Sequence, residues 1–190
     1  MRTLFPISTL LLLLLLHVLI TTTATPTSTT TMITNATYPR IPTQDYKLRR
    51  RKSSAYKFMA PQNAARAALG LPPLIWDRKL ARYARWWANQ RRWDCALEHS
   101  NGPFGENVFW GSSTSFTPYD AARDWVEEKK YYNYGYNSCS FGEECGHYTQ
   151  IVWRKSRRIG CAKAKCFLGR GVYMVCDYDP PGNYIGEKPY

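Results

Sequence analysis

The spacing of apolar residues predicts three helices in the middle of the chain. One covers 78–93, where apolar residues recur at i, i+3, i+4 and i+7 and so share one helical face; they are Leu80, Tyr83, Ala84 and Trp87. An alanine-rich stretch predicts a second helix over 58–70, with Pro61 at an early turn or a kink rather than at its centre. A third helix is expected from its cap, Thr117, to about 131.

The last part of the chain has the pattern of strands. Two stretches, 159–167 and 171–179, are joined by a short Leu-Gly-Arg turn, and apolar side chains alternate with others in the second stretch. They predict a hairpin, and helices followed by strands favour an α+β domain. Between the helices and the hairpin, 146–153 is a run of aromatic and β-branched residues around His147, which is typical of a short buried helix or strand.

The first 53 residues differ in composition from the rest. Residues 1–24 combine a short basic start, seven consecutive leucines and a small-residue exit, which is typical of a signal peptide. A membrane anchor is the alternative, but a span needs ~20 apolar residues and His17 interrupts this run. Residues 25–53 are rich in Thr and Ser and then in basic residues, so we expect a disordered leader with an N-glycosylation acceptor at Asn35. The folded domain is predicted at 54–190.

Charge and cysteine content narrow the range of functions. The net charge is +12, but residues 1–53 hold seven of the 26 Lys and Arg and one of the 14 Asp and Glu, so the remainder carries +6 (19 − 13). We interpret the basic block 47–52 as a linker or a processing site and expect no nucleic-acid partner. A domain of this charge would be attracted to acidic wall polymers or anionic membranes. Six cysteines in an exported chain predict three disulfides, although spacing leaves 15 pairings open.

Few side chains could carry chemistry. Beyond the predicted signal peptide the chain has two histidines, His99 and His147. Glycines and a proline around His99 and Glu106 predict a loop there, and Glu128 falls on the third predicted helix. Two imidazoles and two carboxylates could hold a divalent metal or act as general acid and base. A single histidine in an apolar run is more often a core residue, and spacing alone does not show that the four side chains converge.

Four blocks of sequence resemble the CAP superfamily of secreted proteins, and within it the plant pathogenesis-related class-one branch. In chain order they are Asn63-Ala64-Ala65-Arg66 with Leu74-Ile75-Trp76-Asp77; Asp94-Cys95 and His99-Ser100 with Gly102 to Asn107; Trp125 to Lys129 with Cys145 to Trp153; and Cys176 to Tyr184. The blocks occur in family order and cover about 56–190. Many relatives have a histidine at the position of Gln62, which is a departure outside the site discussed next.

The resemblance implies a fold and a site. The fold is a three-layer α-β-α sandwich, and the site is a cleft lined by His99, Glu106, Glu128 and His147. No established reaction and no required cofactor come with the resemblance, although a divalent ion such as zinc could be held by His99 and His147, with the two glutamates nearby. The resemblance also implies three disulfides, which are Cys95–Cys166, Cys139–Cys145 and Cys161–Cys176.

Two further features follow from the resemblance. A loop containing Tyr131, Tyr132, Tyr134 and Tyr136 would admit sterols or other lipids, because aromatic faces with polar tips suit an apolar ligand with one hydroxyl. The alternative is that these tyrosines only lie at the edge of the hydrophobic core. A C-terminal defence peptide, 180–190, would be released between Asp179 and Pro180. Asp177 stands where asparagine is usual in the triplet before that bond, which bears on recognition by the processing protease.

From these features we predict a secreted, extracellular plant defence protein of the apoplast or cell wall, active against fungi or oomycetes. It would act as a monomer by binding sterols or related lipids of microbial membranes, with peptide release as a second activity. The alternative is a metal-assisted hydrolase in which a glutamate activates a metal-bound water. No nucleophilic serine or cysteine with a neighbouring base is evident. A third hypothesis is a wall-binding module that uses exposed tryptophans, namely Trp86, Trp87 and Trp93.

Overall fold

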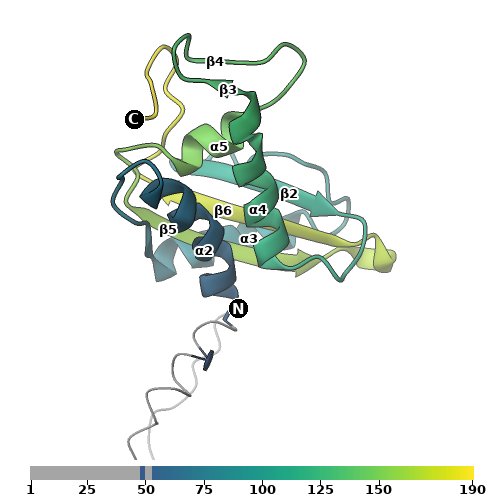
Figure 1. Cartoon of the computed structure of the whole chain (residues 1–190). Helices are drawn as coiled ribbons and strands as arrows, with labels where there is room; N and C mark the ends of the chain where they lie inside the picture. Colours follow the sequence, from purple (N-terminus) through teal and green to yellow (C-terminus); the bar gives the residue numbers. More distant parts are fainter. Residues whose placement is uncertain (1–47, 50–52) are drawn as a thin grey trace, which may run out of the picture. The chain divides into compact units, whose positions relative to one another are not determined.

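The computed structural model describes residues 48–49 and 53–190 (Figure 1). The predicted signal peptide, Asn35 and most of the predicted leader lie outside the described residues. Ser53 caps the first long helix, α2 (Ser54–Ala67), because its hydroxyl accepts a hydrogen bond from the Tyr56 amide. No helix in the part of the chain that the structure describes is long and apolar enough to cross a membrane.

A four-stranded sheet forms the middle layer of the fold. Its strands are, in spatial order, β1 (Ile75–Trp76), β5 (Arg158–Lys165), β6 (Val172–Asp179) and β2 (Gly105–Gly111). β1 is parallel to β5, and the other neighbours are antiparallel. The predicted hairpin is therefore present as β5 and β6, which a 3₁₀ turn, η2 (Phe167–Gly169), connects.

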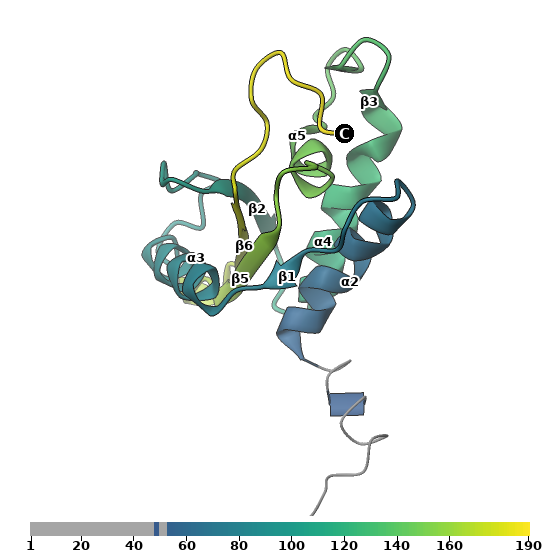
Figure 2. The same ribbon diagram turned by 90° about the vertical axis from the view of Figure 1, so that its left-hand side faces the viewer.

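Helices cover both faces of the sheet. α2, α4 (Pro118–Glu127) and α5 (Gly146–Ile151) lie on one side, and α3 (Arg78–Gln90) lies on the other (Figure 2). Successive side chains of a strand point to opposite faces, so β6 contributes to both cores. The core beneath α2, α4 and α5 receives Val172, Met174, Cys176 and Tyr178, whereas the core beneath α3 receives Tyr173 and Val175. This is the three-layer α-β-α arrangement that the resemblance implies.

α3 packs directly against β5. A Cβ atom added to Gly160 would lie 2.1 Å from Ala81 N, so a side chain at this position would push the helix off the strand. The predicted apolar face does point toward the sheet, with Leu80 and Ala84 fully buried and the two aromatic members half-buried. The helix ends at Gln90, a few residues before the predicted end.

The start of α2 differs from our prediction. The helix begins at Ser54 rather than near 58, which puts Pro61 inside it, so the expectation that this proline marks an early turn is wrong. Proline removes one helical hydrogen bond, but Phe58, Gln62 and Arg66 follow one another at single-turn spacing and are all buried. The burial of this face against α4 and the sheet outweighs the local preference of the proline.

The structure contains three disulfides, Cys95–Cys166, Cys139–Cys145 and Cys161–Cys176, which is the pairing that the resemblance implies. The first joins the chain after α3 to the end of β5. The second closes a short loop before α5, and the third links facing residues of β5 and β6. Each constrains the unfolded chain, by roughly 2–4 kcal/mol in a typical protein.

Candidate functional site

His99 and Glu106 form the first pair of the site. Our prediction that Glu106 lies on a loop is wrong. Glu106 lies on β2, because pairing with β6 already begins at Gly105. His99 Nδ1 lies 2.9 Å from Glu106 Oε1, and the Ser100 amide donates to the same oxygen at 2.9 Å. This contact with Glu106 raises the pKa of His99, whose side chain remains 54% exposed. Burial opposes the ionisation of Glu106, but the bonds from His99 and Ser100 outweigh it, so the pKa of Glu106 is lowered.

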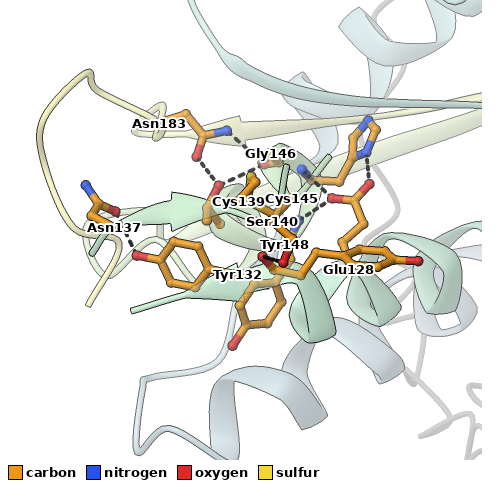
Figure 3. Close-up of a disulfide and its surroundings, with 12 residues drawn as sticks. Glu128, Tyr132, Asn137, Cys139, Ser140, Cys145, Gly146, Tyr148 and Asn183 are labelled. Atoms are coloured by element: carbon orange, nitrogen blue, oxygen red, sulfur yellow. Dashed lines mark hydrogen bonds and ion pairs between the residues drawn. A yellow bond between two sulfur atoms is a disulfide. The ribbon is translucent and has the colours of Figure 1, made fainter. Parts of the chain in front are cut away.

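His147 and Glu128 form the second pair. Glu128 follows α4 at the start of a 3₁₀ turn, η1 (Glu128–Tyr131), and His147 lies in the first turn of α5. Glu128 Oε1 lies 2.5 Å from His147 Nδ1, while its Oε2 accepts the backbone amides of His147 and Tyr148 at 3.0 and 3.2 Å (Figure 3). The residue before α5, Cys145, provides no side-chain cap. The Glu128 carboxylate therefore both caps α5 and orients the imidazole.

The two pairs meet at one cleft. His99, Glu106 and His147 line a cleft of about 370 Å³, and Glu128 reaches it through its contact with His147. Other residues along the cleft are Asn107, Cys139, Glu143, Glu144, Cys145, Gly146 and Asn183. The Asn107 side chain donates to the His147 carbonyl at 3.1 Å and thereby ties β2 to α5. Residues that are far apart in sequence are thus brought together because α5 packs against both η1 and the edge strand β2.

Sequence reasoning missed Glu144 as a candidate ligand. Glu128, Glu144 and His147 can each offer one ligand atom, and these atoms lie within 4.8 Å of one another. His99 is not part of this group. An imidazole nitrogen and carboxylate oxygens are suitable ligands for zinc or another divalent ion. The position of Glu144 next to Cys145 could have indicated this role in the sequence. The Cys139–Cys145 disulfide closes the loop that contains Glu144 and holds it at the start of α5.

A second unpredicted feature of the site is a buried pair of carboxyl groups. Asp177 on β6 faces Glu106 across the β2–β6 ladder and is fully buried. Glu106 Oε2 and both carboxyl oxygens of Asp177 have no hydrogen-bond partner among the described residues. Burial, together with the charge of Glu106, raises the pKa of Asp177 to about 8. From the sequence, Asp177 was expected to matter only for the peptide-release motif and not for the cleft.

The four tyrosines of the predicted lipid loop have different surroundings. Tyr131 ends η1, and Tyr132 belongs to a short ribbon of β3 (Tyr132–Asn133) and β4 (Ser138–Cys139). The Tyr132 hydroxyl donates to Asn137 Oδ1 at 2.7 Å (Figure 3). Tyr134 stacks on Tyr190 with ring centroids 4.7 Å apart, and its hydroxyl donates to the Tyr190 carbonyl. Tyr136 is 85% exposed, so it is the member most open to a ligand.

An aromatic pocket lies beside the cleft, between this ribbon and the C-terminal segment. Its volume is about 280 Å³, and Tyr132, Trp153 and Tyr184 supply its aromatic walls. The polar lining comes from Asn137, Ser138, Thr149, Asn183 and Glu187. The pocket and the cleft share the wall made by Cys139, Cys145, Gly146 and Asn183. Asn183 is fixed in that wall because its side chain donates to the Gly146 carbonyl and accepts from the Thr149 hydroxyl, both at 2.8 Å.

The C-terminal segment is attached to the domain along its length. The Ser156 hydroxyl donates to the Pro180 carbonyl at 2.7 Å, and the Arg154 amide donates to the Pro189 carbonyl at 2.6 Å. Asp179, at the end of β6, is paired with Arg158. The bond between Asp179 and Pro180 therefore directly follows a strand that is buried and paired on both sides.

The three-layer fold, the three disulfides and the cleft with two histidines and two glutamates define a class of protein. Comparison with known proteins identifies the family. Residues 59–178 match the CAP family, described as the cysteine-rich secretory protein family. The chain belongs to this family.

Among curated proteins, it is 54% identical over 160 residues to the pathogenesis-related protein PR-1 of Medicago truncatula, covering 84% of this chain and 91% of that one. It is 51% identical over 140 residues to the pathogenesis-related protein PRMS of Zea mays, covering 73% and 84% of the two chains. Among solved structures, it resembles the Schistosoma mansoni venom allergen-like protein 4, with a TM-score of 0.55, 29% identity and coverage of 70% of this chain and 90% of that one.

The comparisons confirm the resemblance to the plant pathogenesis-related branch and the α+β fold of the family. The chain is a plant defence protein of the CAP family, and an extracellular location agrees with the secretory family it belongs to. The names of these relatives carry no catalytic activity.

Proposed function

We propose that this protein acts in defence by binding a sterol or a related lipid in the aromatic pocket. The observation that carries the proposal is the position of Tyr132, Trp153 and Tyr184 around one pocket with a polar rim. Aromatic walls suit an apolar ring system, and the side chains of Asn137 and Glu187 supply partners for a single hydroxyl. Binding of this kind would remove sterol from fungal or oomycete membranes in the apoplast or cell wall.

The pocket is small for a whole lipid, which suggests how the ligand would lie. Sites for small molecules usually have volumes of roughly 300–1,000 Å³, and this pocket has about 280 Å³. One end of the ligand would fill it while the rest extends along the β3–β4 loop. That loop exposes Tyr136 to receive it, and Phe141, which follows β4, is completely exposed. One protomer contains the whole site, so we propose that the protein acts as a monomer.

The test is sterol binding by the full secreted chain, measured by fluorescence titration with and without a chelator. Tyr132→Ala and Tyr184→Ala should each weaken binding by about tenfold or more, because each removes an aromatic wall. Tyr119→Ala is the matched control, since Tyr119 is similarly exposed but lies on α4 away from the pocket. Binding that is saturable, indifferent to chelator and sensitive to the pocket variants supports the proposal. Equal binding by all three variants contradicts it.

The same titration addresses the alternative of a metal-assisted hydrolase. The group of Glu128, Glu144 and His147 supports that alternative, because a divalent ion such as zinc held there would face the cleft with Glu106 and His99. Such an ion would supply Lewis acidity. His99, positioned by Glu106, would hold or move a proton at its Nδ1 atom. Loss of sterol binding on chelation would reject a pocket that works without metal and make the metal part of the mechanism. Loss of hydrolytic activity in a folded Glu106→Gln variant would then favour the hydrolase.

Release of a C-terminal peptide is a further proposal, and the structure supports a condition on it. A protease that cleaves after Asp179 must bind the preceding residues, yet Cys176, Asp177 and Tyr178 are fully buried in β6. We therefore expect release from the native chain to be slow and to speed up when the Cys161–Cys176 disulfide is reduced, because local opening of β6 then becomes easier. Mass spectrometry of the chain incubated with apoplastic extract, with and without reductant, measures this. Equally fast release in both samples would contradict it.

A further inference from the structure

We propose that the turn between β5 and β6 is a docking surface for an anionic lipid bilayer. The surface, which we call the hairpin patch, consists of Trp93, Phe167 and Leu168 with three cations beside them, Arg92, Lys165 and Arg170. In Figure 1 this turn lies at the right-hand edge of the sheet, whereas β3, β4 and the C-terminus lie at the top. The patch is therefore separate from both the cleft and the aromatic pocket.

The members of the hairpin patch hold one another in place. The rings of Trp93 and Phe167 lie 4.3 Å apart, and the Arg92 guanidinium lies 4.5 Å from the centre of the Phe167 ring. The Phe167 amide donates to the Arg92 carbonyl, and Arg92 Nε donates to the Lys165 carbonyl. The disulfide between Cys95 and Cys166 joins the same two segments covalently. The patch is thus a rigid feature of the fold rather than a set of unrelated surface residues.

Leu168 is the most informative residue of the patch. It adopts a left-handed backbone conformation, with φ of 56°, that bulky side chains rarely take, and its side chain is 87% exposed. The strain is not offset by packing within the chain, because the side chain points into solvent. Trp93, at 72% exposed, projects beside it. Strained, exposed apolar residues are typical of places where the fold serves a contact outside the chain.

Charge selects the partner. The side chains of Lys165 and Arg170 have no partner among the described residues, and the same holds for Arg82 and Arg85 on the exposed side of α3. Two carboxylates that follow Trp93 closely in the sequence, those of Asp94 and Glu98, are both bound by Arg91. An apolar tip with unpaired cations around it matches the interface of a bilayer that contains anionic lipids, where tryptophan and leucine enter the headgroup region and cations meet the phosphates.

A polysaccharide fits the patch less well. Sugars bind to open aromatic faces, but Trp93 is covered on one side by Phe167. A leucine at the tip provides no stacking face, and unpaired cations gain nothing from a neutral glycan. The hypothesis of wall binding through exposed tryptophans is therefore not favoured for this patch, and the experiment below tests it as the alternative.

The experiment is vesicle flotation of the full secreted chain with sterol-free vesicles, so its result does not depend on the sterol proposal. The vesicles contain phosphatidylcholine alone or phosphatidylcholine with phosphatidylglycerol. We expect binding only to the anionic vesicles and a decrease as salt concentration rises. Leu168→Asn should weaken binding roughly tenfold, because it removes the apolar tip. Replacing Lys165 and Arg170 with glutamine should weaken it by a similar factor or more.

Two controls make the result specific. Asparagine tolerates the left-handed conformation, so Leu168→Asn should fold at least as stably as the parent chain, which thermal unfolding checks. Ile185→Asn removes a fully exposed apolar side chain from the C-terminal segment and should leave vesicle binding unchanged. The proposal is overturned by equal binding to neutral and anionic vesicles, by full binding of Leu168→Asn, or by retention on chitin or cell-wall material with no vesicle binding.

Discussion

Replacing Asp177 with asparagine should stabilise the folded protein by several kcal/mol at pH 8 and by very little at pH 4. Asp177 is fully buried opposite Glu106, and burial with the charge of Glu106 raises its pKa to about 8 from 3.8. Between these two values the folded chain holds a proton that the unfolded chain releases. The free energy of unfolding therefore falls as pH rises, by up to about 1.4 kcal/mol per pH unit, and is constant again above the raised pKa.

Asparagine removes this dependence because it is neutral at every pH. Its amide can also donate to Glu106 Oε2, which has no partner in the described residues. The other titratable groups that interact with Asp177 are Tyr173 and Tyr178, and both hydroxyls stay neutral in this range because burial raises their pKa values. The Asp177→Asn variant should consequently show a much smaller decline in stability from pH 4 to pH 8, and the part that comes from other groups with raised pKa values, such as His99, should remain.

Urea unfolding at a series of pH values measures the effect. Glu143→Gln is the matched control, because it removes one carboxylate from an exposed position in the same cleft and should leave the pH dependence intact. The explanation fails if Asp177→Asn and the parent chain show the same slope between pH 4 and pH 8.

Replacing Arg66 with methionine should destabilise the protein by roughly 3–5 kcal/mol, a large part of the total stability of a typical domain. Arg66 is fully buried on α2 and donates to four backbone carbonyls, those of Pro72, Ile151, Trp153 and Ser156, at 2.7–3.0 Å. Burial lowers its pKa to about 10, so it remains charged at neutral pH. Methionine has a similar shape but leaves these acceptors buried without donors.

The change should also affect the cleft, since three of the four carbonyls belong to the last residue of α5 or to the chain that follows it. Without the hydrogen bonds from Arg66, α5, which carries His147, is held less firmly. Ligand binding in the adjoining pocket should therefore weaken even in conditions where the variant is folded. Arg157→Met is the control, because Arg157 is exposed and its side chain makes no hydrogen bond with other described residues. Similar unfolding midpoints for the two variants would contradict a structural role for Arg66.

The sequence by itself determined the elements that depend on neighbouring residues. The buried face of α3 follows from the spacing of Leu80 and Ala84, and the structure has that helix with both residues buried. The β5–β6 hairpin follows from local alternation in the same way. The disulfide pairing and the layered architecture came from the resemblance to a family, because spacing left the pairing open.

Only the tertiary structure decided the geometry of the candidate site and the position of Pro61, because both depend on contacts between residues far apart in the chain. Glu106 looked like a loop residue until pairing with β6 placed it on a strand opposite Asp177. Glu128 and His147 meet only because α5 packs beside η1, and Glu144 joins them through a disulfide loop. Similarly, Pro61 lies within a helix because the buried face of α2 is stabilised by packing against α4 and the sheet. Local propensity fixes elements, whereas burial, partner charges and the resulting pKa values are properties of the assembled fold.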